Sequence, residues 1–201
     1  MPPNDPRELS LNAHWMPFTP NRAFKAAPRL FVGAKDMHYV TDDGRQVLDG
    51  TSGLWCANAG HCRAKIVEAV KKQAETMDYA PGFQMGHPGS FRVATRVAAM
   101  LPGDIDHVFF CNSGSEAVDT ALKIALAYHR ARGEGHRNVF IGRERGYHGV
   151  NFGGMSLGGL PNNQKGFGPM VPGTEHRIPV PYDPAKDRFR REDLEIGRAH
   201  V

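Results

Sequence analysis

Residues 107–132 read HVFFCNSGSEAVDTALKIALAYHRAR, and this stretch decides the fold class. Its first part, residues 107–111, is apolar without alternation, which is typical of a strand buried on both faces of a parallel sheet. The turn at residues 112–115 predicts the start of a helix that extends to about Arg132. One face of that helix carries apolar or small side chains at helical spacing, namely Ala117, Ala121, Ile124, Ala125 and Tyr128. A buried strand followed directly by an amphipathic helix predicts an α/β protein.

Further helices and strands are predicted on both sides of this stretch. Residues 63–79 predict a helix, and Ser90 is a suitable N-cap for a second helix that ends near Pro102. The apolar face of the first of these helices consists of Ile66, Val70, Ala74 and Met77. Short strands are predicted at residues 138–141 and 176–180. Strand, helix and strand in this order predict an open sheet with right-handed crossovers, of which these strands are only a part.

The segment before the first of these helices is predicted to hold a β-hairpin. Short strands are expected at residues 29–32, 37–40 and 46–48. The sequence Asp-Asp-Gly at residues 42–44 is a strong turn signal between such strands. We therefore expect a small antiparallel sheet that follows an irregular stretch at residues 1–28.

The composition of the 201-residue chain excludes several classes of protein. The apolar run at residues 108–111 is far shorter than the ~20 residues that span a bilayer, and the start of the chain lacks the apolar core of a signal peptide. The net charge of +4 is spread along the chain, which favours a small anionic ligand over a nucleic acid. The three cysteines, few and odd in number, indicate reduced thiols and a cytoplasmic location.

The turn between the predicted strand and helix is a candidate phosphate site. Ser113 and Glu116 match the capping box S-x-x-E, in which each side chain accepts a hydrogen bond from the other residue's backbone N–H. Gly114 allows a ligand to come close, and Ser115 offers a hydroxyl beside the free N–H groups and the positive end of the helix dipole. The turn also follows the carboxyl end of a predicted parallel strand, where open α/β sheets bind ligands. The alternative is a well-capped helix without a ligand.

A second candidate, Arg145-Gly146-Tyr147-His148-Gly149, follows the next predicted strand on the same side of the sheet. An aromatic ring flanked by glycines beside a phosphate site can stack on the planar ring of a ligand. A packing role for Tyr147 within the loop is the alternative.

Two other patterns lack the context that their chemistry needs. Residues 154–158 match G-x-S-x-G, the nucleophile elbow of hydrolases, with Ser156 as the nucleophile. That motif needs a hydrophobic strand directly before it and a helix after it, and neither is predicted here. No metal site is predicted, because the ten histidines include no H-x-x-x-H pair and Cys56, His61 and Cys62 lack a second cluster.

Taken together, these motifs resemble the class III aminotransferases, which are pyridoxal-phosphate enzymes of fold type I. The resemblance covers residues 8–194, and its strongest part is FCNSGSEA at residues 110–117. The stretches WMPFTPNR at residues 15–22 and GLWCAN at residues 53–58 resemble the branch that acts on ω-amino acids such as β-alanine with pyruvate. The fold implied is α/β and incomplete, with the N-terminal segment of the small domain and the first part of the large open-sheet domain.

The resemblance implies a cofactor site and a substrate pocket. The residues implied to bind pyridoxal 5'-phosphate are Ser113, Gly114, Ser115, Tyr147 and His148. Among these, Gly114 and Ser115 would hold the phosphate and Tyr147 would stack on the pyridine ring. The residues implied to line the substrate pocket are Phe18, Leu54, Trp55 and Phe83, and Phe83 would reach the active site of the neighbouring subunit. Ordinary core burial is the alternative for Trp55 and Phe18.

The resemblance also implies how the chain is divided. Residues 1–66, with the β-hairpin, are expected in the small domain, and residues 67–194 in the first part of the large cofactor-binding domain. The Schiff-base lysine and the aspartate that pairs with the pyridinium nitrogen lie outside this chain, so we expect no catalytic residue in it and no turnover by it alone.

Residues 195–201, EIGRAHV, depart from the family pattern. They can be encoded by GAG ATC GGA AGA GCA CAC GTC, a common sequencing adapter, so we interpret them as a non-native tail.

The function implied is transamination, in which an amino group moves from an ω-amino acid or amine to pyruvate or another oxo acid. The partners implied are a small-molecule amino donor, an oxo-acid acceptor and a second copy of the chain, with no nucleic acid and no membrane. Related decarboxylation or mutase chemistry on the same scaffold stays open. A non-catalytic module that binds pyridoxal phosphate or phosphate is the alternative, and a hydrolase acting through Ser156 is the third.

Overall fold

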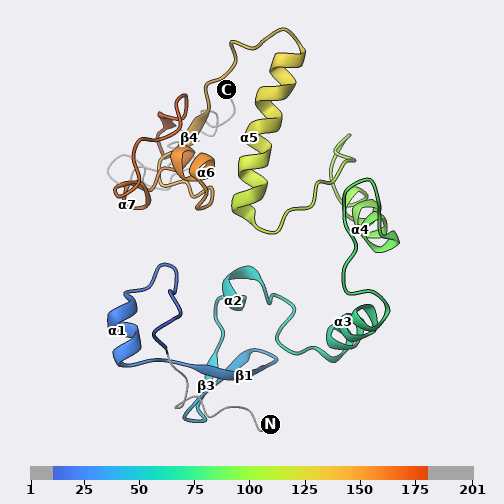
Figure 1. Ribbon diagram of the computed structural model, residues 1–201, viewed down its shortest axis with the longest axis vertical. Helices are drawn as coiled ribbons and strands as arrows, with labels where there is room; N and C mark the ends of the chain where they lie inside the picture. The colour runs from blue at the N-terminus through green and yellow to red at the C-terminus, as the bar shows by residue number, and fades with distance from the viewer. Residues whose placement is uncertain (1–10, 181–201) are drawn as a thin grey trace, which may run out of the picture. The chain divides into compact units, whose positions relative to one another are not determined.

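The computed structural model describes residues 11–180 of the chain (Figure 1). These residues divide into two compact units, one that ends at Phe91 and one that begins at Arg92. The expected boundary between residues 66 and 67 concerns the domains of a complete enzyme and stays a prediction, and the expected tail at residues 195–201 lies outside the described residues.

The first unit contains the expected antiparallel sheet, with the strand order β1-β2-β3. Its strands are β1 (Phe31–Lys35), β2 (His38–Thr41) and β3 (Gln46–Leu48). In the register of the first pair Lys35 lies opposite His38, and in the second pair Tyr39 lies opposite Val47. The hairpin prediction is therefore confirmed, although β1 starts two and ends three residues later than expected and β2 is displaced by one residue.

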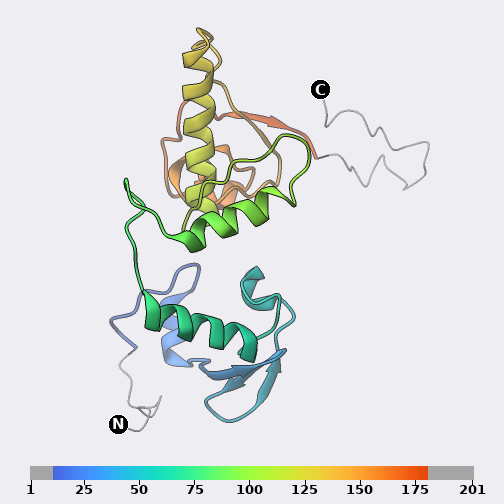
Figure 2. The same ribbon diagram turned by 90° about the vertical axis from the view of Figure 1, so that its right-hand side faces the viewer.

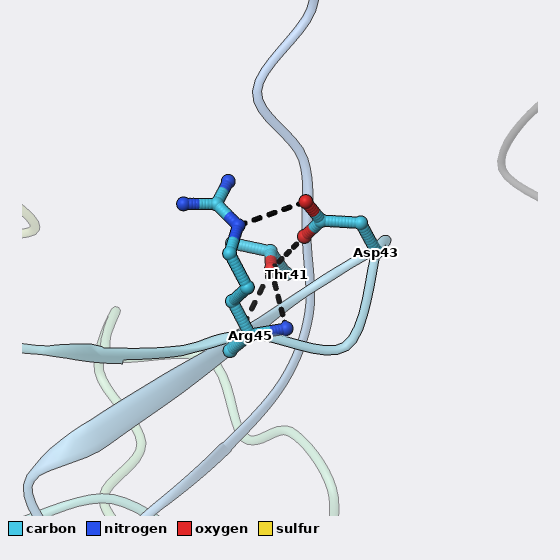
Figure 3. Close-up of polar contacts among 3 residues, drawn as sticks. All are labelled: Thr41, Asp43 and Arg45. Atoms are coloured by element: carbon cyan, nitrogen blue, oxygen red, sulfur yellow. Dashed lines mark hydrogen bonds and ion pairs between the residues drawn. The ribbon is translucent and has the colours of Figure 1, made fainter.

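The turn between β2 and β3 is closed by side chains as well as by backbone (Figure 3). The Thr41 hydroxyl donates to the Asp43 carboxylate and also accepts from the Arg45 amide at 3.0 Å. The Arg45 guanidinium donates to Asp43 Oδ2 at 2.8 Å. Gly44 has a φ of 84°, a left-handed conformation that favours glycine. These contacts explain why the Asp-Asp-Gly sequence forms a turn here.

The helices of the first unit are α1 (Asn21–Ala26), α2 (Ser52–Trp55) and α3 (Ala64–Thr76). The helix predicted at residues 63–79 is confirmed as α3, with Arg63 as its N-cap residue. Figure 2 shows α3 and the small antiparallel sheet of this unit. The apolar face of α3 is exposed in this unit, with Ile66 at 51% and Val70 at 63% exposure. That face has the spacing of a buried surface and no covering element within the unit.

Helix α4 (Pro88–Ala98) begins at the end of the first unit and extends into the second. The prediction that Ser90 caps it is wrong, since the helix starts two residues earlier at Pro88. Proline is favoured in the first turn because its φ is already helical and its missing N–H has no helical partner there. The Ser90 hydroxyl instead donates to the carbonyl oxygen of His87 at 2.8 Å.

The longest helix of the second unit is α5 (Gly114–Ala131) (Figure 1). Its bounds agree with the predicted helix to about Arg132, and Ser113 is its N-cap. The strand predicted directly before it, at residues 107–111, does not form. A strand exists only where a neighbouring strand accepts its backbone hydrogen bonds, and no such neighbour lies beside residues 107–111 in the described part of the chain.

The parallel sheet of the second unit consists of β4 (Ile141–Arg143) and β5 (His176–Ile178). Ile141 lies opposite His176, and Arg143 opposite Ile178. The predicted strand at 138–141 therefore begins later than expected, although the Phe140 amide extends the pairing by donating to Gly173 O at 2.7 Å. The parallel pairing confirms that this unit is part of an open α/β sheet.

Along the chain, β4 and β5 are separated by the short helices α6 (Phe152–Leu157) and α7 (Pro161–Gln164). Met155 and Leu157 are the buried hydrophobic residues of the described chain, at 8% and 9% exposure. The carbonyl groups at the C-terminal end of α6 accept hydrogen bonds from two side chains. Gln164 Nε2 donates to Met155 O and Gly158 O, at 2.8 and 2.7 Å, and Arg177 Nη2 donates to Ser156 O at 2.6 Å. These bonds satisfy carbonyls that a helix leaves free at its end.

Glycines allow the segments around α6 to approach one another closely. A Cβ atom placed on Gly142 would lie 2.2 Å from Leu157 O, and one on Gly154 would lie 2.1 Å from His148 O. A Cβ atom on Gly159 would lie 2.1 Å from Arg143 O. The Gly-rich stretch after β4 therefore packs through its backbone against β4 and against the loop that contains His148.

Candidate functional site

The N-terminus of α5 presents free backbone donors. Ser113 Oγ accepts from the Glu116 amide at 3.1 Å, as the capping box predicts. The Glu116 carboxylate, however, accepts from the Asn112 amide at 2.9 Å rather than from Ser113. In the part of the chain that the structure describes, the amides of Gly114 and Ser115 donate to no protein group, and the space where a Cβ of Gly114 would stand is open to 4 Å. Such a helix start is suited to an anion.

The loop at residues 145–150 lies against this helix start. Gly149 has a φ of 103°, and a Cβ atom on it would lie 2.7 Å from Ser115 Cα and Ser115 Oγ. The Val150 amide donates to Ser115 Oγ at 2.9 Å. Position 149 therefore requires glycine, both because of its positive φ and because a side chain there would clash with Ser115. The contact brings the loop that carries Tyr147 and His148 to the first turn of α5.

Helix α6 contacts both α5 and the loop at residues 145–150. The Gly154 amide donates to Asp119 Oδ1 on α5 at 2.7 Å, and Gly154 also packs on the carbonyl of His148. His148 is half-buried, whereas Tyr147 is 56% exposed. The sequence did not indicate the roles of Asp119 and Val150, because both act through contacts between segments 35 residues apart.

The arrangement fits a ligand that carries both a phosphate and a planar ring. Two unpaired amides, the dipole of α5 and the hydroxyl hydrogen of Ser115 can all interact with phosphate oxygens. The exposed ring of Tyr147 is available for stacking. The cavity behind the loop has a volume of about 10 Å³ and touches Tyr147 and Met155, so it accepts no more than a water-sized group. A ring would have to contact Tyr147 on its exposed side.

The four predicted substrate residues all lie in the first unit. Phe18, Leu54, Trp55 and Phe83 are 81%, 69%, 84% and 85% exposed. Core burial, the alternative for Phe18 and Trp55, is therefore wrong within the described residues. The structure brings the five predicted cofactor residues together in the second unit and places these four in the other unit, and their roles as pocket residues stay predictions.

Leu54 and Trp55 occupy an unusual backbone conformation. Four consecutive residues of α2 have positive φ angles, namely Ser52 (52°), Gly53 (59°), Leu54 (56°) and Trp55 (70°). The Trp55 amide donates to Thr51 O at 3.1 Å, so α2 is one turn of left-handed helix. This conformation costs an L-residue about 1–2 kcal/mol, and it is typical of functional sites that the surrounding structure holds in place. No local sequence signal predicted it.

A buried carboxylate lies next to this turn. Asp49 is 7% exposed, and its Oδ1 accepts from the amide and the hydroxyl of Thr51 at 3.1 and 3.2 Å. Its Oδ2 lies 2.8 Å from His61 Nε2. A hydrogen bond from the Gly53 amide is the main cause that lowers the pKa of Asp49 to about 2, with His61 and Thr51 adding to it against the opposing effect of burial. Asp49 is therefore ionised at neutral pH, and His61 must carry its proton on Nε2.

Tyr39 completes this cluster. Burial raises the pKa of the Tyr39 phenol, and the negative charge of Asp49 and a hydrogen bond with that carboxylate raise it further. The ring of Tyr39 stacks on Phe31 at a centroid distance of 4.4 Å and lies 4.5 Å from the ring of His61. Sequence reasoning did not single out Asp49 or Tyr39, since nothing in their local sequence distinguishes them from ordinary strand and loop residues.

The structure shows the surroundings of Ser156 in the G-x-S-x-G match and of the residues that could bind a metal. Ser156 is 1% exposed inside α6, and its Oγ accepts from the Val171 amide at 3.0 Å. It is therefore a packed structural hydroxyl, and the residues around it do not form a nucleophile elbow. Among residues 11–180, no three His, Cys, Asp or Glu side chains gather as a metal site. No helix among them is long and apolar enough to cross a membrane, and the three cysteines are free.

The chain matches known proteins over most of its length. The family model described as aminotransferase class-III matches residues 22–198. An omega-aminotransferase of Caulobacter vibrioides is 61% identical over 166 residues, which cover 83% of this chain and 38% of that protein. A beta-alanine–pyruvate aminotransferase of Pseudomonas aeruginosa is 52% identical over 82% of this chain and 37% of that protein.

Solved structures agree with these relatives. An omega-transaminase from Thermomicrobium roseum superposes with a TM-score of 0.82 at 33% identity, over 86% of this chain and 39% of that one. The omega transaminase of Pseudomonas jessenii in complex with PMP has a TM-score of 0.81 at 30% identity. The chain spans a little over a third of the length of these proteins. The fold is thus a partial fold of pyridoxal-phosphate-dependent transaminases, and the chain belongs to the class III aminotransferase family.

Proposed function

We propose that this chain is part of a longer pyridoxal-phosphate-dependent transaminase. The complete protein moves an amino group from an ω-amino acid or amine to pyruvate or another oxo acid. The coverage of 38% of the Caulobacter vibrioides relative supports the view that further polypeptide completes the enzyme. The lysine that anchors the cofactor belongs to that further polypeptide, so the 201-residue chain alone does not turn over substrate.

The cofactor phosphate is held by the start of α5. The free amides of Gly114 and Ser115 donate to phosphate oxygens, and the Ser115 hydroxyl donates its hydrogen while it accepts from Val150. Ser113 keeps the first turn of the helix in place through its bond to the Glu116 amide. Tyr147 contacts one face of the pyridine ring, and His148 supports the loop. When bound, the cofactor supplies the electron sink that amino transfer needs.

The substrates follow from the relatives. The 52% identical protein is named a beta-alanine–pyruvate aminotransferase, and a 51% identical protein of Pseudomonas putida is named an omega-amino acid–pyruvate aminotransferase. These names favour an ω-amino acid as donor and pyruvate as acceptor. Leu54 and Trp55, both apolar and exposed, line the pocket for the carbon chain of the donor.

Exposed apolar helix faces indicate that other polypeptide packs on this chain in the complete enzyme. Val70 of α3 is 63% exposed and Val93 of α4 is 50% exposed, although both belong to amphipathic helices. The rest of the enzyme and a second subunit cover such faces, and Phe83 contributes to the active site of the neighbouring subunit. The three free cysteines support a reducing, cytoplasmic location.

The observation that carries this proposal is the Val150–Ser115 contact, which brings the aromatic loop to the free amides of α5. The test uses the full-length protein, purified without added cofactor. We expect absorbance of bound pyridoxal phosphate after reconstitution and the formation of alanine from pyruvate with β-alanine as the donor.

Two results would contradict the proposal. Failure to retain pyridoxal phosphate after dialysis would overturn the cofactor site. Retention of the cofactor with no amino transfer from β-alanine, longer ω-amino acids or amines would replace the enzyme with the alternative, a non-catalytic binding module.

A further inference from the structure

We propose that Asp49 is a positioning residue that holds α2 in its left-handed conformation and so determines where Leu54 and Trp55 stand. This inference rests on the proposed function for one part only, the assignment of Leu54 and Trp55 to the substrate pocket. The conformation of the turn itself does not depend on that assignment.

The hydrogen bonds of Asp49 hold the residue at the start of the turn. Its carboxylate accepts from the amide and the hydroxyl of Thr51 at 3.1 and 3.2 Å, directly before α2. The Thr51 carbonyl oxygen in turn accepts from the Trp55 amide at 3.1 Å, the hydrogen bond that closes the left-handed turn. The buried carboxylate is thereby satisfied, and it fixes the residue from which the turn starts.

The Tyr39 hydroxyl closes the space beside the turn. A Cβ atom on Gly53 would lie 3.2 Å from Tyr39 Oη and 3.6 Å from Ala57 Cβ. A side chain here would be tight against this hydroxyl and would lie 4.0 Å from Asp49 Oδ2, and the φ of 59° at Gly53 also favours glycine. The turn is thus held by hydrogen bonds from one side and by close packing at its second residue.

The carboxylate is in turn fixed to the sheet of the first unit. His61 Nε2 donates to Asp49 Oδ2 at 2.8 Å. The backbone of His61 forms two hydrogen bonds with Asp36, at 2.7 and 3.0 Å, next to the turn between β1 and β2. The ring of Tyr39 stacks on Phe31 at 4.4 Å and lies tilted against the ring of His61 at 4.5 Å, both measured between ring centroids. A continuous set of contacts therefore joins the hairpin to α2 through Asp49.

The contacts of Asp49 determine the positions of two large apolar side chains. Leu54 and Trp55 are 69% and 84% exposed, so packing by their own side chains within the described residues does not hold them. Their backbone fixes their direction instead. A small displacement of a group that positions substrate changes the rate and the preference among substrates.

The first test measures the position of Trp55 without using activity. The full-length protein is labelled with 5-fluorotryptophan, and the ¹⁹F resonance of Trp55 is assigned by its loss in Trp55→Phe. In Asp49→Asn we expect this resonance to shift or split, because an amide presents a donor to groups that themselves donate. The matched control is Asp43→Asn, which removes the carboxylate of the hairpin turn (Figure 3) and leaves the Trp55 resonance in place.

The second test measures donor preference. The ratio of kcat/KM for β-alanine to that for a bulkier aromatic amine is expected to change by about tenfold in Asp49→Asn, with the affinity for pyridoxal phosphate unchanged. Tyr39→Phe serves as a second variant if Asp49→Asn does not fold, since it keeps the ring stacked on Phe31 and removes only the hydroxyl. It is expected to change the resonance and the ratio in the same direction by a smaller amount.

The outcomes separate this inference from the proposed function. An unshifted Trp55 resonance in both variants overturns it, whatever the activity. A shifted resonance with an unchanged donor ratio overturns the link to specificity. A wild-type protein that transfers no amino group overturns the proposed function, while the ¹⁹F spectra still decide whether Asp49 positions the turn.

Discussion

The Val150 amide donates to the Ser115 hydroxyl at 2.9 Å, although 35 residues separate the two along the chain. The bond fixes the loop at residues 145–150 on the first turn of α5. The hydroxyl oxygen uses one lone pair for this bond and keeps its hydrogen for a ligand. The loop with its aromatic ring and the free amides of the helix therefore share one anchor.

Substitution of Ser115 in the full-length protein is expected to weaken cofactor binding. Ser115→Ala removes a hydrogen bond to a charged group, which contributes about 1.5–3 kcal/mol, so the Kd for pyridoxal phosphate rises by about tenfold or more. Ser115→Asp places a negative charge against the phosphate and weakens binding further. Both are measured by absorbance titration. Ser90→Ala is the control, and cofactor occupancy that stays intact in Ser115→Asp would contradict the site.

Gly149→Ala is expected to lower the stability of the second unit. The φ of 103° is unfavourable for an L-residue, and the new Cβ would lie 2.7 Å from Ser115 Cα. Strain of this kind costs about 1–3 kcal/mol. Thermal unfolding measures the loss, with Gly166→Ala, where 4 Å around the Cβ position is empty, as the matched control. Equal melting temperatures for the two variants would show that the loop does not pack on Ser115.

The stabilising effect of Asp49 is expected to disappear in acid. The folded-state pKa of about 2 lies below the unfolded value, which is about 3.9. Asp49 therefore contributes stability that is fully present above the unfolded pKa and is lost as the pH falls through the folded pKa. The difference in melting temperature between the wild type and Asp49→Asn should narrow from about pH 5 toward pH 2. A difference that does not vary with pH in this window would argue against the ionised carboxylate.

Ser156 is expected to be inert toward serine-reactive probes. It is 1% exposed and its oxygen accepts from the Val171 amide, so a fluorophosphonate does not reach it. Ser156→Ala should instead lower the free energy of unfolding by about 1–3 kcal/mol, because the Val171 amide loses its acceptor. Mass spectrometry of the probe-treated protein and denaturant unfolding measure the two effects. Covalent labelling that the substitution abolishes would restore the hydrolase interpretation.

Locally determined features could be predicted from the sequence. The start of α5 at Ser113 and the turn at Asp43 and Gly44 depend on side chains within three or four residues of one another. The two cofactor motifs were expected at neighbouring positions, and Ser115 and Gly149 do contact each other. The chemical roles of these residues are predictions that the ligand experiments above must decide.

Features that depend on distant partners could not be predicted. Residues 107–111 have the apolar pattern of a strand, but pairing requires a neighbour that the pattern does not specify. The left-handed turn at Leu54 and Trp55 contradicts the local preference of both residues, and its support comes from Asp49 and Tyr39. Conflicts of this kind between local preference and structure are expected at functional sites.

The backbone contacts at Gly142, Gly154 and Gly159 also limit how this protein can evolve. At each position a Cβ atom would lie 2.1–2.2 Å from a carbonyl oxygen, so a single substitution there cannot be absorbed by repacking of side chains. Substitutions are therefore expected to be tolerated better at exposed positions of this segment, such as Asn162 and Lys165, than at these three glycines. We therefore expect proteins that share this backbone packing to keep glycine at these three positions whatever their substrate.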